Sequence, residues 1–129
     1  MALSCWVQRS AEMRVLVVDD HLSFRRLASR LLGEAGYTVV GEASDGESAI
    51  REVRRLRPDL VLLDVVLPDR SGVSVARDLV LAKDAPRVIL ISSRSRSDFG
   101  NSFGWPAGCS FLPKHELTAA RLRNMLASG

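Results

Sequence analysis

Short apolar runs that stop abruptly on polar residues are the feature that most constrains how this chain folds. Residues 13–20 (MRVLVVDD) and 59–64 (DLVLLD) end on aspartates, and residues 88–92 (VILIS) end on a serine. Runs this short, continuously apolar and rich in valine and leucine are typical of strands buried on both faces of a parallel sheet. We therefore predict central strands at these places, with further strands at residues 37–43 and 111–112.

The segments between these runs have the periodicity of helices. Apolar residues from 24 to 35 recur at intervals of three and four residues, as on one face of an amphipathic helix. A second helix is predicted to begin at the capping-box sequence SDGE (44–47) and to end before Pro58, because the residue before a proline disfavours helical geometry. A third helix follows the turn-rich loop 67–72. A last helix is predicted over residues 117–126, with an inward face made of Ala119, Leu122, Met125 and Leu126.

The alternation of strands and helices predicts one α/β domain with a parallel sheet that is covered on both faces. The domain is expected to span residues 13–127. Residues 1–12 follow neither period and are expected to form a disordered N-terminal extension. The stretch 94–110 contains three glycines and a proline and has little helical periodicity, so any helix there should be short or irregular.

The composition is that of an ordinary globular domain, with 129 residues, 47% hydrophobic and 26% charged. No apolar run approaches the roughly 18 residues of a membrane span, and the N-terminus lacks a signal-peptide pattern. Cys5 and Cys109 have no metal-ligand spacing. These features exclude the membrane, secreted and fibrous classes and predict a reduced, cytoplasmic chain.

The basic residues give only a weak indication of the kind of partner that the chain binds. The formal net charge is only +3, and the basic side chains are interleaved with acids along the chain. Arginines are densest in the second predicted helix, at positions 51, 54, 55 and 57, where they are interpreted as a solvated helix face. A charge balance this mild does not by itself indicate a nucleic-acid partner.

The polar residues at the strand ends define the candidate functional site. Asp19 and Asp20 follow the first strand, Asp64 ends the third, Ser92 ends the fourth and Lys114 follows the fifth. Ligands of open parallel sheets bind at the carboxyl ends of the strands, so these groups are expected to meet at one rim. Crowded carboxylates repel each other, and a hard divalent ion such as Mg²⁺ relieves that repulsion. Lysine is a mobile point charge that suits a phosphoryl oxygen.

Four segments carry this pattern in order: VLVVDDH at 15–21, DLVLLDVVLPDRSG at 59–72, VILISS at 88–93 and FLPK at 111–114. Together they resemble the receiver domains of bacterial two-component response regulators, over about residues 13–127. The resemblance is strongest to the NarL/FixJ-type subfamily, whose receivers usually carry a helix-turn-helix. It implies a flavodoxin-like (βα)5 fold, a doubly wound five-stranded parallel sheet with strand order 2-1-3-4-5.

The resemblance implies a phosphoacceptor and a set of metal ligands. Asp64 would accept a phosphoryl group from a histidine kinase or a phosphotransfer protein. Asp20 and Asp64 would hold Mg²⁺ directly, Asp19 would help through a water molecule, and the backbone carbonyl of Val66 would complete the protein ligands.

The resemblance also implies the residues that respond to phosphorylation. Lys114 would pair with the phosphoryl oxygens, Ser92 would be the switch hydroxyl, and Phe111 would be the aromatic side chain that follows it. Pro68 and Gly72 would shape the loop after the phosphoacceptor. The switch position departs from the commoner threonine, because serine keeps the hydroxyl and loses a methyl group.

The predicted function is a phosphorylation-dependent signalling switch that uses Mg²⁺ and acts through altered protein contacts. Beyond self-phosphorylation from phosphodonors and autodephosphorylation, no enzymatic activity is expected. Two alternatives stay open, a pseudo-receiver that serves as a constitutive interaction module and a Mg²⁺-dependent phosphohydrolase that forms an aspartyl-phosphate. The phosphohydrolase is disfavoured because its D-x-D motif is missing from the first strand, where Asp19 and Asp20 are adjacent.

The expected partners are a histidine kinase or phosphotransfer protein and a downstream protein, with a homodimer left open. Direct DNA binding is not expected, because the core needs the last predicted helix and the arginines form no continuous stripe. No room for an attached helix-turn-helix is expected within the 129 residues. No membrane association is expected.

Four other residues have ordinary interpretations. His21 and His115 flank the site in sequence and are interpreted as surface or supporting histidines. Cys109 is interpreted as a small core residue. Trp105 is open to two interpretations, an exposed docking residue or an anchor for its loop.

Overall fold

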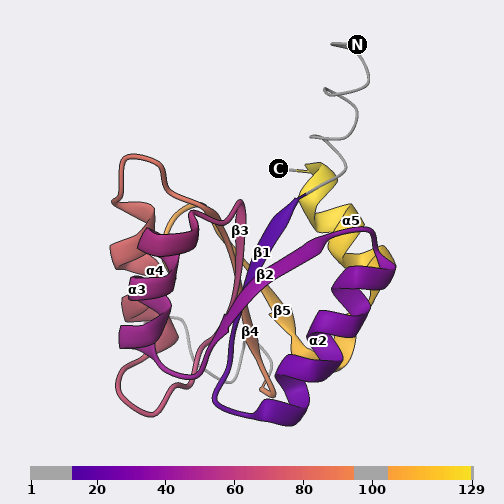
Figure 1. Cartoon of the computed structure of the whole chain (residues 1–129), viewed down its shortest axis with the longest axis horizontal. Coiled ribbons are helices and arrows are strands. Elements are labelled where there is room, and N and C mark those ends of the chain that lie inside the picture. Colours follow the sequence, from indigo (N-terminus) through magenta and orange to yellow (C-terminus); the bar gives the residue numbers. More distant parts are fainter. Residues whose placement is uncertain (1–12, 95–104, 129) are drawn as a thin grey trace.

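The computed structural model describes residues 13–94 and 105–128. Within these ranges, five parallel strands form one sheet in the order β2-β1-β3-β4-β5 (Figure 1). This order confirms the flavodoxin-like α/β fold predicted from the sequence. The strands are β1 (Arg14–Val18), β2 (Thr38–Ala43), β3 (Leu60–Asp64), β4 (Arg87–Ser92) and β5 (Cys109–Pro113).

Helices cover both faces of the sheet. Helices α2 (Leu22–Glu34) and α5 (Ala119–Ser128) pack on one face, and α3 (Gly46–Leu56) and α4 (Gly72–Val80) pack on the other (Figure 1). A short 3-10 helix, η3 (Lys114–Glu116), leads from β5 towards α5. Alternate residues of each central strand therefore serve two separate cores.

Strand β3 illustrates the two cores, since all five of its residues are buried. Leu60 and Leu62 pack with residues of α2 and α5, including Leu32 and Leu122. The intervening residues of β3 pack with residues of α3 and α4 on the opposite face. A strand with apolar neighbours on both faces has no polar face, which explains the continuous apolar runs in the sequence.

The start of α3 differs from the prediction by one residue. The N-cap is Asp45 rather than Ser44, because the Asp45 carboxylate accepts a hydrogen bond from the Ser48 amide at 2.8 Å. The Ser48 hydroxyl in turn accepts from the Asp45 amide at 3.3 Å, which completes a capping box. The amide of Glu47, the predicted partner of Ser44, instead donates to the carboxylate of Asp69 at 3.0 Å. The local Asp45–Ser48 pair thus marks this boundary, and the loop that carries Asp69 takes up the next amides.

The last helix also begins later than predicted, at Ala119 rather than at residue 117. The side chain of Thr118 accepts a hydrogen bond from the Arg121 amide at 3.1 Å and so caps the first turn. The predicted inward face is confirmed for Leu122, which is fully buried, and for Met125 and Leu126, which pack against the same core. Helix α5 is therefore a core helix.

The predicted extension 1–12 and most of the stretch 94–110 lie outside the described residues. Among residues 13–94 and 105–128, no helix has the length and apolar character needed to cross a bilayer. Cys109 is a half-buried free thiol on β5 that packs against the core, as predicted. Burial raises the pKa of this thiol.

Candidate functional site

The polar groups at the strand ends meet at one rim of the sheet. Asp19 follows β1, Asp64 ends β3, Ser92 ends β4, and these are the buried polar residues of the described part of the chain. The ammonium group of Lys114, which follows β5, lies 2.6 Å from Oδ2 of Asp19 and 3.1 Å from Oδ2 of Asp64. The convergence predicted from the parallel topology is therefore present.

Asp20 and His21 extend this cluster towards solvent. The His21 amide donates to Oδ1 of Asp19 at 2.8 Å, and Nδ1 of its ring lies 3.0 Å from that oxygen and 3.1 Å from Oδ1 of Asp20. Both side chains are exposed, at 67% for His21 and 37% for Asp20. One ligand atom from each of Asp19, Asp20, His21 and Asp64 lies within 4.8 Å of the others.

The charges of the cluster are coupled by burial. Burial raises the pKa of Asp64 to about 6, and the charge of Asp19 adds to this rise, although the Val66 amide and Lys114 oppose it. Burial also pushes the pKa of Asp19 upwards, but Lys114 and the hydrogen bonds from His21 outweigh it and leave that pKa below its usual value. The pKa of Lys114 is raised, because its two carboxylate partners outweigh its own burial. The single ammonium group of Lys114 therefore has to balance the charges of two buried carboxyl groups, Asp19 and Asp64.

The donor set fits a hard divalent cation. Oδ2 of Asp19 is buried and lies close to Nζ of Lys114, yet it accepts no well-aligned hydrogen bond. Carboxylate oxygens gathered this closely are the ligands that Mg²⁺ takes, together with water. A second positive charge near Asp64 would offset the burial and the repulsion from Asp19 that raise its pKa.

A hollow of about 270 Å³ opens above the cluster. Its lining includes Asp20, Asp64 and Lys114 from the charged cluster and Ser92 from the end of β4. Val66 also lines it, with a side chain that is 59% exposed and an amide that donates to Oδ1 of Asp64 at 3.1 Å. A small anion that enters the hollow would meet the lysine, the serine hydroxyl and the acceptor carboxylate together.

The two predicted switch residues lie on neighbouring strands. The Ser92 hydroxyl is buried below the hollow and accepts a hydrogen bond from the Arg94 amide at 3.1 Å. Phe111 is half-buried on β5, and its ring meets that of Trp105 edge to face, with centroids 5.1 Å apart. Trp105 also packs on the α3–α4 core, so the structure favours the interpretation as a loop anchor.

The loop after Asp64 is held by contacts that leave little space. The Gly72 amide donates to the Val65 carbonyl at 2.7 Å, and a Cβ at position 72 would lie 1.9 Å from the Asp64 carbonyl oxygen. Asp69 fastens the same loop to α3, because its carboxylate accepts the Gly46 amide at 2.8 Å. The sequence indicated a turn here but carried no signal for the Asp69 contact.

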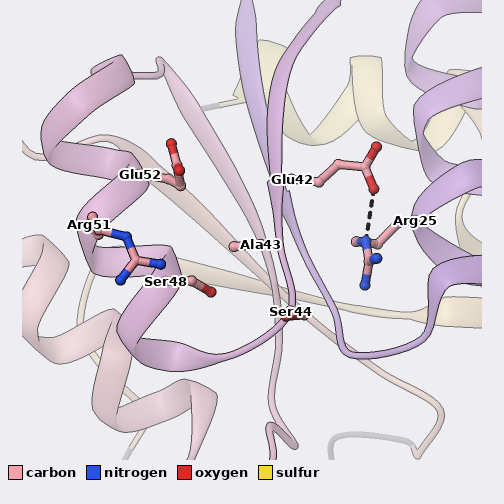
Figure 2. Close-up of a pocket in the computed structure, with 7 residues that line it drawn as sticks. All are labelled: Arg25, Glu42, Ala43, Ser44, Ser48, Arg51 and Glu52. Carbon is pink, nitrogen blue, oxygen red and sulfur yellow. Dashed lines mark hydrogen bonds and ion pairs between the residues drawn. The ribbon is translucent and has the colours of Figure 1, made fainter.

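Arg25 is a supporting residue that the sequence analysis missed. Its Nη1 donates to the backbone carbonyl of Asp19 at 2.6 Å, and its Nε donates to Glu42 at 2.8 Å. This pair lies at a polar hollow between β2, α2 and α3 (Figure 2), whose volume is about 230 Å³. Arg25 thus ties the loop that carries Asp19 and Asp20 to the end of β2. The sequence gives no signal for this contact, because Glu42 lies on another element.

Comparison with known proteins agrees with this fold. The family model described as the response regulator receiver domain matches residues 15–126. The chain therefore belongs to the family of response-regulator receiver domains, the signalling domains of two-component systems.

Three similar proteins illustrate the match. The chain is 40% identical to the protein CcdB of Bacillus subtilis over 80 residues, which cover 62% of this chain and 67% of CcdB. It is 37% identical to the transcriptional regulatory protein PdtaR of Mycobacterium tuberculosis over 83 residues, 64% of this chain but only 40% of PdtaR. The solved receiver domain of the response regulator NarL of Mycobacterium tuberculosis has a TM-score of 0.77 and 32% identity, with 91% of this chain and 94% of that chain covered.

Proposed function

We propose that this receiver is a phosphorylation-dependent switch in which Asp64 accepts a phosphoryl group from a phosphohistidine. A carboxylate oxygen of Asp64 attacks phosphorus, the phosphorus–nitrogen bond breaks, and the electron pair returns to the imidazole nitrogen of the donor. The observation that carries this proposal is that Asp64 contacts Lys114 and also lines the hollow. The product is an acyl phosphate at the rim of the sheet.

We propose that Mg²⁺ binds beside the acceptor. Asp20 and Asp64 would hold the ion directly, Asp19 would act through a water molecule, and Val66 would contribute its backbone carbonyl. The close spacing of the three carboxylates and the raised pKa of Asp64 support this assignment. The bound ion would neutralise charge that develops on the transferring group.

Lys114 and Ser92 would respond to the new phosphoryl group. Nζ of Lys114 now contacts both Asp19 and Asp64, and phosphorylation would draw it to the phosphoryl oxygens. Ser92 lines the same hollow and would donate its hydroxyl hydrogen to a phosphoryl oxygen. Phe111, on the neighbouring strand, would change its packing against Trp105 and carry the signal to the surface.

Mass spectrometry of the intact protein tests the acceptor. Acetyl phosphate with Mg²⁺ should add one phosphoryl mass to the wild type, and Asp64→Asn should abolish the addition. The matched control is Asp84→Asn, which removes an exposed aspartate outside the site and should label normally. Persistent labelling of Asp64→Asn at another residue would refute the assignment. Failure of the wild type to label would favour a pseudo-receiver.

Calorimetry tests the ion independently of the transfer. Mg²⁺ should bind the unmodified protein weakly, because the phosphoryl oxygens that complete its coordination are missing. Asp20→Asn should abolish measurable binding, while Asp84→Asn leaves the affinity unchanged. An unchanged affinity in Asp20→Asn would contradict the ligand assignment.

We propose that the output is a protein contact in the cytoplasm, with no catalysis of other substrates and no direct DNA binding by these residues. Helix α5 uses Leu122, Met125 and Leu126 in the core, so that face is unavailable to read a DNA groove. A pull-down with beryllofluoride, a phosphoryl mimic, should enrich a protein partner over the unmodified form. Sequence-specific DNA binding that survives about 0.2 M salt would contradict this proposal.

A further inference from the structure

A groove runs along the outer side of helices α3 and α4, away from the rim of the sheet. One hollow of about 460 Å³ lies along α3 and is lined by Ile50, Arg51, Arg54 and their neighbours. A second hollow of about 330 Å³ lies between α3 and α4. The two hollows share Ile50 and Arg54, so they form one continuous surface, the α3–α4 groove.

The floor of the α3–α4 groove is apolar. Ile50 and Val53, one helical turn apart on α3, are half-buried and line the groove opposite Leu79 of α4. Leu81, at the end of α4, is 83% exposed, more than any other large apolar side chain in the described part of the chain. Exposed apolar side chains grouped in a groove mark interaction surfaces more often than single ones do.

The rim of the groove carries positive charge that its own acids do not neutralise. Glu52 pairs with Arg55 at 2.7 Å. Of the two acids that line the groove, Asp78 pairs with Arg70 at 2.7 Å, and Glu47 lies 3.9 Å from the same arginine. Arg51 and Arg54 have no acidic partner among the described residues. They lie three positions apart and line the groove together.

We propose that the α3–α4 groove docks an acidic amphipathic helix of a protein partner. Apolar residues of that helix would cover Leu81 and the floor, and its carboxylates would pair with Arg51 and Arg54. An apolar floor, which includes Val53 and Leu79, suits apolar side chains and is unsuited to a nucleic-acid backbone. The residues that line this groove are separate from those that line the hollow at Asp64.

Fluorescence anisotropy with a designed probe tests the proposal. The probe is a fluorescein-labelled helical peptide of about 20 residues, with leucines along one stripe and glutamates elsewhere. It should bind the wild-type protein saturably and more weakly as salt rises. Arg51→Glu with Arg54→Glu should weaken binding at least about tenfold, and Leu81→Ser about threefold.

A matched double variant distinguishes docking from general charge attraction. Arg30→Glu with Arg123→Glu makes the same change in net charge at exposed positions of α2 and α5, and should alter the affinity less than about twofold. Amide chemical shifts of the wild type should move in residues 47–55 and 78–82 when the probe binds. Equal weakening by the two double variants, or no saturable binding, would overturn the proposal. Tighter binding of a labelled DNA duplex with the same arginine dependence would also overturn it.

Discussion

Two ion pairs of similar length lie in opposite surroundings in this molecule. Nζ of Lys114 lies 2.6 Å from Asp19 at the rim of the sheet, and Nη2 of Arg55 lies 2.7 Å from Glu52 on the outside of α3. The side chains of Lys114 and Asp19 are 17% and 0% exposed, whereas those of Arg55 and Glu52 are 65% and 21% exposed. Distance alone therefore says little about what each pair contributes.

The difference lies in desolvation. The exposed pair can exchange its partner for water at little cost in free energy, so arginines on α3 are free to meet another protein. The buried pair has no water to replace a lost partner, so a change of one charge alters the whole cluster. A change of charge at the rim of the sheet therefore has a larger effect on stability than a change of charge on the outside of α3.

The largest expected effect tests how closely the rim is packed. Gly72→Ala should lower the free energy of unfolding by at least about 4 kcal/mol, because the added Cβ would lie 1.9 Å from the Asp64 carbonyl oxygen. Urea denaturation measures this loss. The control is Gly33→Ala in α2, where no atom lies within 4 Å of the added Cβ and a gain of about 0.5 to 1 kcal/mol is expected. Equal effects of the two substitutions would show that the rim is not tightly packed.

The next largest effect is expected when the cation of each ion pair is removed in turn. Lys114→Met should lower the free energy of unfolding by about 3 kcal/mol at pH 7.5 without added metal, because it leaves buried carboxylates without a cation. Arg55→Met, which removes the exposed partner, should change it by less than about 0.5 kcal/mol. Methionine keeps most of the apolar stem in both variants, so the comparison isolates the charge. Similar losses of unfolding free energy in the two variants would show that burial does not make the Lys114 pair more important than the Arg55 pair.

The smallest expected effect is a pH dependence of the unfolding free energy that comes from Asp64 at the rim of the sheet. The pKa of Asp64 is raised to about 6 in the folded protein from an ordinary value of 3.8. A raised carboxyl pKa means that folding disfavours the charged form, so this group lowers stability as the pH rises from about 4 to 6, with no further loss above that range. Asp64→Asn should therefore be more stable than wild type by up to about 3 kcal/mol at pH 7.5 and nearly equal to it near pH 4.

Urea titrations at several pH values in EDTA check this dependence. Asp84→Asn, the exposed control, should leave the wild-type profile unchanged. Asp19 acts in the opposite direction, because its pKa is lowered in the folded protein. Its ionised carboxylate stabilises the fold above a pH of about 4, and this stabilisation is lost in acid. A difference between Asp64→Asn and wild type that does not vary with pH would contradict the raised pKa.

Part of the site was predictable because it depends on topology. Parallel strands place all their carboxyl ends at one edge, so the residues that follow apolar runs must meet there. Asp19, Asp64, Ser92 and Lys114 meet as predicted, from four strands that are far apart in sequence. The roles proposed for them stay predictions until the labelling and metal-binding measurements are made.

Other contacts depend on which elements face each other in space. Arg25 holds the Asp19 carbonyl, and Asp69 accepts the amides of Gly46 and Glu47 in the first turn of α3. Neither contact lies within one helix or one strand. A local pattern therefore cannot indicate it.

The sequence by itself determined the order of strands and helices, the burial of the central sheet and the identity of the rim residues, because hydrophobic periodicity and strand ends are local properties. Only the tertiary structure decided how strongly Asp64 is desolvated, how little space surrounds Gly72 and which arginines of α3 lack an acidic partner among residues 13–94 and 105–128. Burial and charge pairing are set by neighbours from other elements. Their energies therefore arise only when the whole chain is packed.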